Sequence, residues 1–359
     1  MEEIRILVTG AGGAPAANFI NSLRLVKDKK FYIVGTDVNR YHLELSTEAD
    51  TNYVSVPVND PEYFNLMNRI LEKEKIQFLH CQTEQEVAYW SVNKDRIKAK
   101  TLIPPKEILE VINNKDRLNA LCGELGISVP RAFHLSDKSS LAESLDVLLR
   151  DDKKVWLRAT CGAGSRASLP VSNFKQADGW IDYWTTQKGL MYKDFMVSEF
   201  LPGKEFAFQS IWYKGELITS MVRERVEYLF GNLFPSGHSS SPSVAKTVHR
   251  DDVNDVATKA IKAADPNATG IFCADIKENK KGEPCLMEIN VGRFFTTSNN
   301  FSHAGLNMPY YYVLLGMDKE KELPKLPQYN GIPAGWYWIR SMDMGYKLVK
   351  GEKWTSKQI

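Results

Sequence analysis

Residues 270–294 read GIFCADIKENKKGEPCLMEINVGRF, and the fold prediction starts from this stretch. Two runs of alternating apolar residues, GIFCADIKEN and PCLMEINV, flank the turn sequence NKKGE, which is typical of a β-hairpin. Asp275 lies on the first predicted strand, and Glu288 and Asn290 lie on the second. Because residues two positions apart share one face of a strand, Glu288 and Asn290 project together. If the register places Asp275 opposite them, three oxygen-bearing side chains converge.

These side chains suggest a metal site. Two carboxylates and an amide oxygen are hard ligands, suited to magnesium that also binds water and phosphate oxygens. The predicted metal ligands are therefore Asp275, Glu288 and Asn290. Arg293 follows closely and can neutralise charge on a transferring phosphoryl group, which makes it the predicted catalytic residue. The alternative interpretation is a solvated strand face with polar residues.

The segment VWLRATCGAGSRAS (155–168) carries residues suited to phosphates. Arg158 lies at the end of a predicted strand, and the loop after it contains Gly162, Gly164 and Ser165. A cation beside backbone amides of a glycine-rich loop can surround a phosphate. A simple turn after a strand is the alternative.

Two more segments carry candidate nucleotide ligands. Lys115 opens a predicted helix, where a cation is unfavourable to the helix dipole unless an anion lies nearby. SEFLPGKEF (198–206) could form a hinge whose backbone contacts adenine while Glu205 binds ribose hydroxyls. A solvated lysine and an ordinary strand, turn and strand are the structural alternatives. The hinge residues are Ser198, Glu199, Phe200 and Leu201.

The composition indicates a soluble globular protein. The 359 residues, 43% of them hydrophobic, can bury a large core in two or three domains. Lys and Arg (46) nearly balance Asp and Glu (44), so no global field favours nucleic acid or a membrane surface. The sequence contains no apolar run of about 20 residues. Five scattered cysteines favour reduced thiols, and we expect a cytoplasmic protein without nucleic-acid or membrane partners.

The periodicity predicts a mixed fold, α/β at the start and α+β afterwards. The first hundred residues alternate strand and helix patterns, which favours a Rossmann-like parallel sheet with helices on both faces. Strand patterns dominate after residue 154, and the ending GWYWIRSMDMGYKLVKGEKW predicts two short strands. Helices are expected at about 18–27, 61–75, 114–125, 140–150 and 251–264.

The glycine-rich segment TGAGGAPAANF (9–19) matches a dinucleotide fingerprint only in part. Gly10 and Gly12 fit, and Asp37 ends the next predicted strand, but Pro15 replaces the third glycine. We favour a structural turn or a loop that binds another ligand. An NAD-dependent oxidoreductase is the alternative that this segment alone supports.

Taken in order, four segments resemble the ATP-grasp superfamily, most closely its carbamoyl-phosphate-synthetase-like branch. They are NKDRLNALCGELGISVPRA, VWLRATCGAGSRAS, VSEFLPGKEFAFQSIWYKGEL and GIFCADIKENKKGEPCLMEINVGRF. The resemblance covers about residues 110–320 and implies one grasp unit. The implied domains are a Rossmann-like pre-ATP-grasp domain (1–110), a small subdomain (111–195), a large subdomain with the magnesium site (196–325) and C-terminal strands packing on the core (326–359).

The resemblance implies a carboxylate-amine ligase that uses ATP with magnesium or manganese. Such enzymes phosphorylate a carboxylate to an acyl phosphate, which an amine then attacks. Lys115, Arg158 and the loop 162–165 would bind the ATP phosphates, the hinge would face adenine and Glu205 the ribose. Asp275, Glu288 and Asn290 match the metal ligands, and Arg293 matches the arginine that stabilises the acyl phosphate.

Two departures from the family pattern are visible. Arg158 replaces the usual lysine, a substitution also found in the synthetase branch, and two residues separate Asn290 from Arg293 where E-x-N-P-R has one. Carboxyphosphate or carbamate chemistry on bicarbonate, and ATP binding without turnover, remain alternatives.

Three arginines are candidate anchors for a substrate carboxylate, because a guanidinium fork matches carboxylate geometry. They are Arg223, Arg225 and Arg340, and surface or ion-pair roles are the alternative for each. The expected partners are a small carboxylate and an amine, and a homodimer is compatible with the sequence. The aromatic runs 309–313 and 336–338 suit the core better than a dimer interface.

Overall fold

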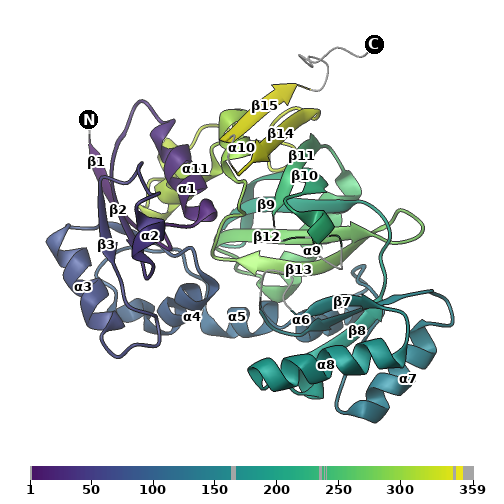
Figure 1. The fold of residues 1–359 in the computed structure, drawn as a ribbon. Coiled ribbons are helices and arrows are strands. Elements are labelled where there is room, and N and C mark those ends of the chain that lie inside the picture. The colour runs from purple at the N-terminus through teal and green to yellow at the C-terminus, as the bar shows by residue number, and fades with distance from the viewer. Residues whose placement is uncertain are drawn as a thin grey trace.

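The computed structural model describes residues 2–162, 167–233, 237, 239, 241–342 and 345–350. Its N-terminal domain holds a four-stranded sheet in the order β3-β2-β1-β4, in which every pairing is parallel (Figure 1). The predicted Rossmann-like sheet is confirmed. The elements are β1 (Glu3–Thr9), α1 (Ala14–Arg24), β2 (Lys30–Asp37), α2 (Arg40–Leu43), β3 (Thr51–Val54), α3 (Tyr63–Lys73), β4 (Phe78–His80) and α4 (Glu84–Asn93).

Helices cover both faces of this sheet because its strands are apolar on both sides. Ile6 and Val8 of β1 share a buried cluster with Phe19 of α1, whereas Leu7 between them belongs to a cluster with Met67 of α3. One predicted boundary was wrong. Helix α1 begins before Pro15 rather than at about residue 18, since the fixed φ of proline suits a first helical turn.

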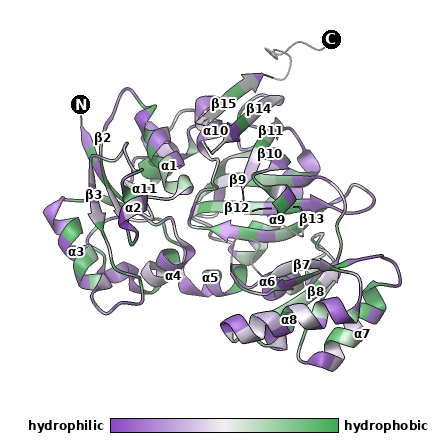
Figure 2. Cartoon of the chain, viewed as in Figure 1, coloured by the Kyte–Doolittle hydropathy of each residue, from purple (hydrophilic) through white to green (hydrophobic). Residues whose placement is uncertain are grey.

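A second, antiparallel sheet has the order β5-β8-β6-β7, and α7 and α8 pack on it. In Figure 2 both helices carry hydrophilic and hydrophobic residues, as expected when one face meets a sheet. The predicted boundary between residues 195 and 196 falls inside β8, which pairs with β6 along its whole length. The elements are β5 (Ala132–His134), α7 (Lys138–Leu148), β6 (Val155–Ala159), β7 (Ser168–Val171), α8 (Phe174–Lys188) and β8 (Phe195–Glu199).

The third sheet is antiparallel with the order β13-β12-β9-β10-β11-β14-β15. The predicted hairpin is β12 and β13, and the C-terminal strands form as predicted and extend this sheet. The strands are β9 (Glu205–Tyr213), β10 (Glu216–Tyr228), β11 (Pro242–Val248), β12 (Gly270–Glu278), β13 (Pro284–Val291), β14 (Trp336–Ser341) and β15 (Gly345–Lys350). The helices around it are α5 (Lys106–Ile112), α6 (Lys115–Glu124), α9 (Asp251–Ala264), α10 (Asn299–His303) and α11 (Met308–Gly316).

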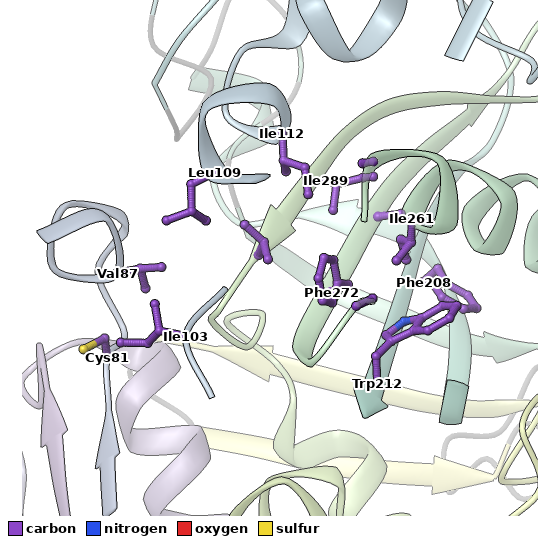
Figure 3. Packing of buried hydrophobic residues seen from close by; sticks show 14 of the residues in the cluster. Cys81, Val87, Ile103, Leu109, Ile112, Phe208, Trp212, Ile261, Phe272 and Ile289 are labelled. Carbon is purple, nitrogen blue, oxygen red and sulfur yellow. The ribbon is translucent and has the colours of Figure 1, made fainter. Parts of the chain in front are cut away.

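The two faces of this sheet differ in what covers them. On one face, Phe208 and Phe272 share a cluster with Ile261 of α9 and with Ile289 (Figure 3). The same cluster continues through Leu109 and Ile112 of α5 to Val87 and Cys81 of the N-terminal domain, so the core is continuous between domains. On the other face, Met221 and Ile271 pack with residues of α11, while the part of that face farther along the strands opens into a cleft.

The aromatic runs lie mainly in the core, as predicted. Tyr311 and Tyr312 of α11 and Trp338 of β14 are buried. All five cysteines are free thiols, and Cys161 alone among them is exposed. Of the helices in the described part of the chain, none has the length and hydrophobicity needed to cross a bilayer.

Candidate active site

A cleft of about 670 Å³ lies where the N-terminal domain and the two antiparallel sheets meet. Pro15 and Glu84 line it from the N-terminal domain, Arg158 from the small sheet, and Asp275 and Glu288 from the large sheet. Its walls therefore come from segments that are far apart in the sequence.

The strand register explains why charged residues gather on one face of the large sheet. Asp275 pairs directly with Glu288 of β13 and with Ala207 of β9, and Ala207 pairs with Arg223 of β10. Residues directly opposite each other point to the same side of a sheet. The register required by the hairpin prediction is thus present, and it adds Arg223 to the same row.

Each predicted metal ligand contacts a cation or an amide. Lys115 Nζ lies 3.3 Å from Glu288 Oε2, and Arg225 Nη2 lies 2.5 Å from Asp275 Oδ1. Asn290 Nδ2 donates to Glu288 Oε1 at 3.4 Å. Burial and the charge of Glu288 raise the pKa of Asp275 against the opposing effect of Arg225. For Glu288 the effect of burial is outweighed by Lys115 and Arg158, which lower its pKa.

This donor set fits a hard divalent cation. In the described residues no group of three or more His, Cys, Asp and Glu side chains could by itself hold a metal ion. Two carboxylates and an amide instead leave coordination positions to water and phosphate oxygens, which is the arrangement magnesium prefers. The lowered pKa of Glu288 keeps that carboxylate ionised as a ligand must be.

The two predicted phosphate-binding cations converge at the end of β6. Lys115 Nζ donates to the Gly162 carbonyl at 2.8 Å, and its backbone N–H donates to Thr160 O. Arg158, only 4% exposed, donates through Nη2 to Met287 O on β13 at 3.2 Å, and its Nε has no hydrogen-bond partner among the described residues. Gly162 lines the cleft, whereas Gly164 and Ser165 lie outside the described residues.

The hinge residues form one end of the cleft. Glu199, Phe200 and Leu201 line it, and the backbone of Glu199 is fixed by its N–H donating to Arg131 O at 2.9 Å. Glu205 Oε1 lies 2.5 Å from Lys277 Nζ, and the Tyr228 hydroxyl donates to Glu205 Oε2. The predicted hinge residues 199–201 and Glu205 therefore line the same cleft.

Comparison with known proteins agrees with this geometry. Residues 191–331 match the family described as ATP-grasp in the biosynthetic pathway with Ter operon. Among curated proteins, no sequence matches the chain. The biotin carboxylase domain of Hydrogenobacter thermophilus 2-oxoglutarate carboxylase, solved as a dimer with MgADP, ADP and bicarbonate, superposes with a TM-score of 0.68 at 14% identity, covering 93% of this chain and 73% of that chain.

Two further structures are similar. N5-carboxyaminoimidazole synthetase from Staphylococcus aureus with ADP gives a TM-score of 0.69 at 10% identity, covering 94% of this chain and 82% of that one. L-amino acid ligase from Bacillus licheniformis gives 0.63 at 12% identity, with 94% and 79% covered. The chain has the ATP-grasp fold. The resemblance indicated by the sequence motifs is confirmed.

The extra residue before Arg293 is accommodated by Gly292. Gly292 has a φ of 74°, and a Cβ there would lie 2.8 Å from Val87 Cγ1, so only glycine fits. Arg293 Nη2 then donates to Asn290 Oδ1 at 2.6 Å and lies 3.6 Å from Glu84 Oε2. Arg293 thus lines the ATP-grasp cleft beside the predicted metal ligands despite the longer spacing.

Two predicted residues do not line the cleft. Ser198 is fully buried, and its backbone pairs with Ala132 and Trp156 inside the small sheet. Arg340 donates to the carbonyls of Pro242 and Thr296, at 2.9 and 3.3 Å, and so joins chain segments. The side chains of Ser198 and Arg340 thus lie outside the lining of the cleft, and neither strand packing nor a carbonyl partner can be inferred from residue type.

Several cleft residues had no role in the sequence prediction. Lys277 is the one that local pattern could have found, since it lies two residues after Asp275 on the same face of β12. Glu84 comes from the N-terminal domain and Phe295 directly follows the hairpin stretch, and nothing in the residue type marks either one as a cleft residue. Further examples are Trp156, Tyr228 and Thr296.

The glycine-rich turn of the N-terminal domain is held by its own chain. Gly12 donates its backbone N–H to Asp37 Oδ2 at 3.1 Å, and a Cβ on Gly12 would lie 2.4 Å from His42 Cβ. Asp37 therefore supports the turn, which favours the structural interpretation over a dinucleotide site. Pro15 of the same segment reaches the ATP-grasp cleft.

Proposed function

We propose that this protein is an ATP- and magnesium-dependent ligase that activates a carboxylate as an acyl phosphate for attack by an amine. The observation that carries the proposal is the meeting of three cations, Lys115, Arg158 and Arg293, around the paired carboxylates Asp275 and Glu288 in one cleft. The similar structures solved with ADP or MgADP support ATP as the nucleotide and magnesium as its metal.

In the proposed reaction, an oxygen of the substrate carboxylate bonds to the γ-phosphorus of ATP as the bond to the ADP oxygen breaks. The amine nitrogen then bonds to the acyl carbon, phosphate leaves, and the nitrogen loses a proton. Lys115 and Arg158 would hold the phosphates in place, and Arg293 would stabilise the charge that develops on the transferred group. Asp275, Glu288 and Asn290 would hold magnesium, which supplies charge neutralisation at phosphate oxygens.

In this proposal, the hinge end of the cleft binds the nucleotide base and the ribose. Phe200 and Leu201 offer apolar contact for adenine, and Glu205 offers a carboxylate for the ribose hydroxyls. Lys277 and Tyr228 hold that carboxylate in position in the absence of nucleotide.

The test is phosphate release from ATP across a panel of carboxylates and amines, followed by Glu288→Gln with the active pair. We expect this variant to lose ADP formation while keeping the wild-type thermal midpoint. Glu283→Gln is the matched control, because Glu283 lies in the turn of the same hairpin and outside the cleft. Full activity in Glu288→Gln would overturn the metal assignment.

Bicarbonate is a second candidate substrate, favoured by Arg158 in place of the usual lysine and by the similar structure solved with bicarbonate. ATP hydrolysis stimulated by bicarbonate without any other acid would establish it. ATP binding by calorimetry with no hydrolysis under any condition would instead indicate a non-catalytic nucleotide-binding protein.

A further inference from the structure

A buried chain of hydrogen bonds links the N-terminal domain to the backbone directly after Arg293. Gln82, in the loop between β4 and α4, is 5% exposed, and its Nε2 donates to Phe294 O at 3.1 Å. His80, at the end of β4, is fully buried, and its Nε2 lies 2.9 Å from Gln82 Oε1. Neither Gln82 nor His80 lines the cleft, so an effect of either on the reaction passes through Phe294 and its neighbours.

The chemistry of the three groups fixes the direction of this chain. A carbonyl oxygen only accepts hydrogen bonds, so the atom of Gln82 that faces Phe294 O is the amide nitrogen. Gln82 Oε1 then faces His80, whose Nε2 carries the proton and donates it. Burial lowers the pKa of His80 to about 4, so the ring is neutral at neutral pH. The histidine, stacked on Phe19 at 4.0 Å between ring centroids, thus holds the amide of Gln82 in the orientation that donates to Phe294.

Arg293 is held from both sides and at its side chain. Before it, the Gly292 N–H donates to Ile271 O of the large sheet at 2.8 Å. After it, Phe294 O accepts the bond from the N-terminal domain. The first residue of α4, Glu84, brings its Oε2 to 3.6 Å from Arg293 Nη2. The loop between β4 and α4 therefore contacts both the backbone and the guanidinium end of the residue proposed to stabilise the transferred phosphoryl group.

The Phe294 carbonyl depends on one donor, whereas a nearby carbonyl has two. Among the described residues, Gln82 is the one hydrogen-bond donor to Phe294 O. Thr296 O accepts from Asn18 Nδ2 at 2.7 Å and from Arg340 Nη1 at 3.3 Å. Loss of the Asn18 side chain therefore leaves Thr296 O with a donor, and Thr296 is three residues from the arginine. Asn18 provides a matched control for Gln82, because both are buried amides of the N-terminal domain.

We propose that Gln82, oriented by His80, is a positioning residue for Arg293. Its bond to the Phe294 carbonyl fixes the backbone from which the guanidinium reaches the transferred phosphoryl group. This inference rests on the proposed ligase function and gives the N-terminal domain a part in phosphoryl transfer. A small displacement of a catalytic group lowers the rate strongly, whereas the proposed ATP contacts of Lys115 lie outside this chain of hydrogen bonds.

Steady-state kinetics with the active substrate pair tests the proposal. Gln82→Met keeps the side-chain length but removes both hydrogen bonds. We expect its kcat to fall by about 10- to 100-fold and its KM for ATP to stay at the wild-type value. His80→Phe, which keeps an aromatic ring without the N–H, should lower kcat less, and His80→Gln, whose amide can donate, should recover part of that loss. Asn18→Leu should keep a kcat close to that of the wild type.

A double-mutant cycle separates positioning from a general structural role. Arg293→Met removes the group through which Gln82 is proposed to act. Adding Gln82→Met to Arg293→Met should therefore lower kcat no further, because residues that act as a unit are not additive. Independent, multiplying losses in the double variant, or an equal loss of kcat in Asn18→Leu, would overturn the inference.

Hydrogen exchange provides a measurement that needs no turnover. The N–H groups of Gly292 and Ser298 are hydrogen-bonded on either side of Phe294. Peptides that contain them should exchange faster in ligand-free Gln82→Met and His80→Phe than in the wild type, and Glu283→Gln should exchange as the wild type does. Unchanged exchange in both variants would overturn the inference even in an active ligase. A wild-type protein that forms no ADP with any substrate would count against the ligase proposal instead.

Discussion

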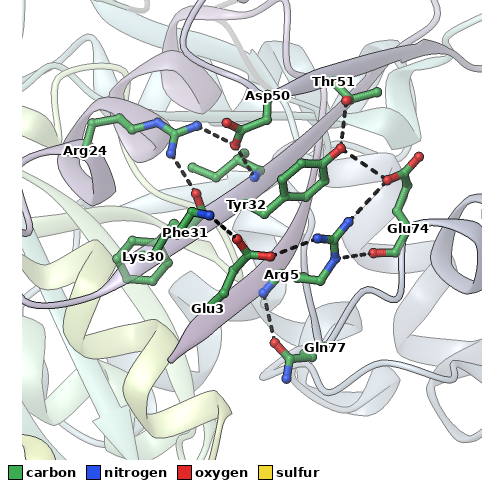
Figure 4. Close-up of polar contacts among 11 residues, drawn as sticks. Glu3, Arg5, Arg24, Lys30, Phe31, Tyr32, Asp50, Thr51, Glu74 and Gln77 are labelled. Carbon is green, nitrogen blue, oxygen red and sulfur yellow. Dashed lines mark hydrogen bonds and ion pairs between the residues drawn. The ribbon is translucent and has the colours of Figure 1, made fainter. Parts of the chain in front are cut away.

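Two charge networks in this molecule use the same residue types in different ways. On the N-terminal sheet, Arg5 donates to Glu3 and Glu74 and lies 3.8 Å from the centre of the Tyr32 ring (Figure 4). Lys30 pairs with the second oxygen of Glu3. Each acid in this surface network forms an ion pair with a cation. Hydrogen bonds with Lys30 and Arg5 lower the pKa of Glu3.

In the cleft network Arg158 and Arg223 are buried and the other charged residues are half-buried, and the charges are not fully balanced. Asp275 has its pKa raised by burial although Arg225 contacts it, and Arg223 has no acid partner among the described residues. Charges in water with complete pairing contribute modestly to stability, whereas buried and incompletely paired charges are kept where a ligand completes them. Function is therefore indicated by burial and missing partners, and not by the presence of charged residues.

The largest expected effect is that of Asp275→Asn. We expect ATP turnover to fall on the order of 10²–10³-fold, because the variant removes one of the two charged metal ligands proposed here. Steady-state kinetics with the active substrate pair measures this. Asp50→Asn is the control from the surface network, where Asp50 pairs with Arg24. A comparable loss of turnover in Asp50→Asn would contradict the functional difference between the two networks.

The second largest expected effect is on the KM for ATP, and it should differ between two lysines that each pair with a glutamate. Lys115→Met should raise the KM for ATP by about 10- to 100-fold, since Lys115 is proposed to bind phosphates and its charge also lowers the pKa of Glu288. Lys30→Met, which removes the partner of Glu3, should leave the KM unchanged. Calorimetric titration with ADP would detect the same difference, and equal ADP affinity in both variants would contradict it.

The sequence predicted the hairpin because it depends on local pattern. Period-two alternation and a turn indicated the hairpin, and parity on one strand placed Asn290 on the same side as Glu288. The pairing of Asp275 with Glu288 also needs a register shift between Asp275 and Ile276, which the local pattern does not indicate. The isolation of Arg223 could not be predicted, because it depends on which acids Arg225 and Lys277 already occupy. Which acid pairs with which cation depends on the packing of strands β9, β10 and β12. No short stretch of sequence contains all three strands.

A similar limit applies at the edges of the cleft. The β6 alternation that buries Leu157 also directs Arg158 to the cleft, and this is visible in the sequence. Ser198 sits in an equally plausible strand and yet is fully buried. The difference arises from how the small sheet meets its neighbours, a tertiary fact with no compositional signal.

Arg5→Ala is expected to lower the stability of the protein without changing its turnover. The side chain is 24% exposed and stacks on Tyr32 while donating to Glu74 O and to two carboxylates. We expect the free energy of unfolding to fall by about 1–2 kcal/mol from the lost hydrogen bonds and stacking. Urea denaturation measures this, and turnover at a temperature well below the midpoint should equal that of the wild type.

The smallest expected effect is the pH dependence contributed by Glu3. Its pKa is lower in the folded protein than the ordinary value of 4.5, because Lys30 and Arg5 donate hydrogen bonds to it. A group with a depressed folded pKa contributes stability that is present above the unfolded pKa and is lost as pH falls through the folded pKa. Glu3→Gln should therefore lower the thermal midpoint slightly at neutral pH and leave it equal to the wild type in acid.

The midpoints of Glu3→Gln and wild type, measured from pH 7 downward, should converge only below the unfolded pKa of Glu3. Added salt should shrink the difference at neutral pH, because Glu3 and Lys30 are both accessible to solvent. Turnover should not change, since Glu3 is outside the cleft. A difference between the two proteins that persists in acid would show that the side chain stabilises β1 through packing, and the surface network would then no longer be a purely electrostatic contrast to the cleft.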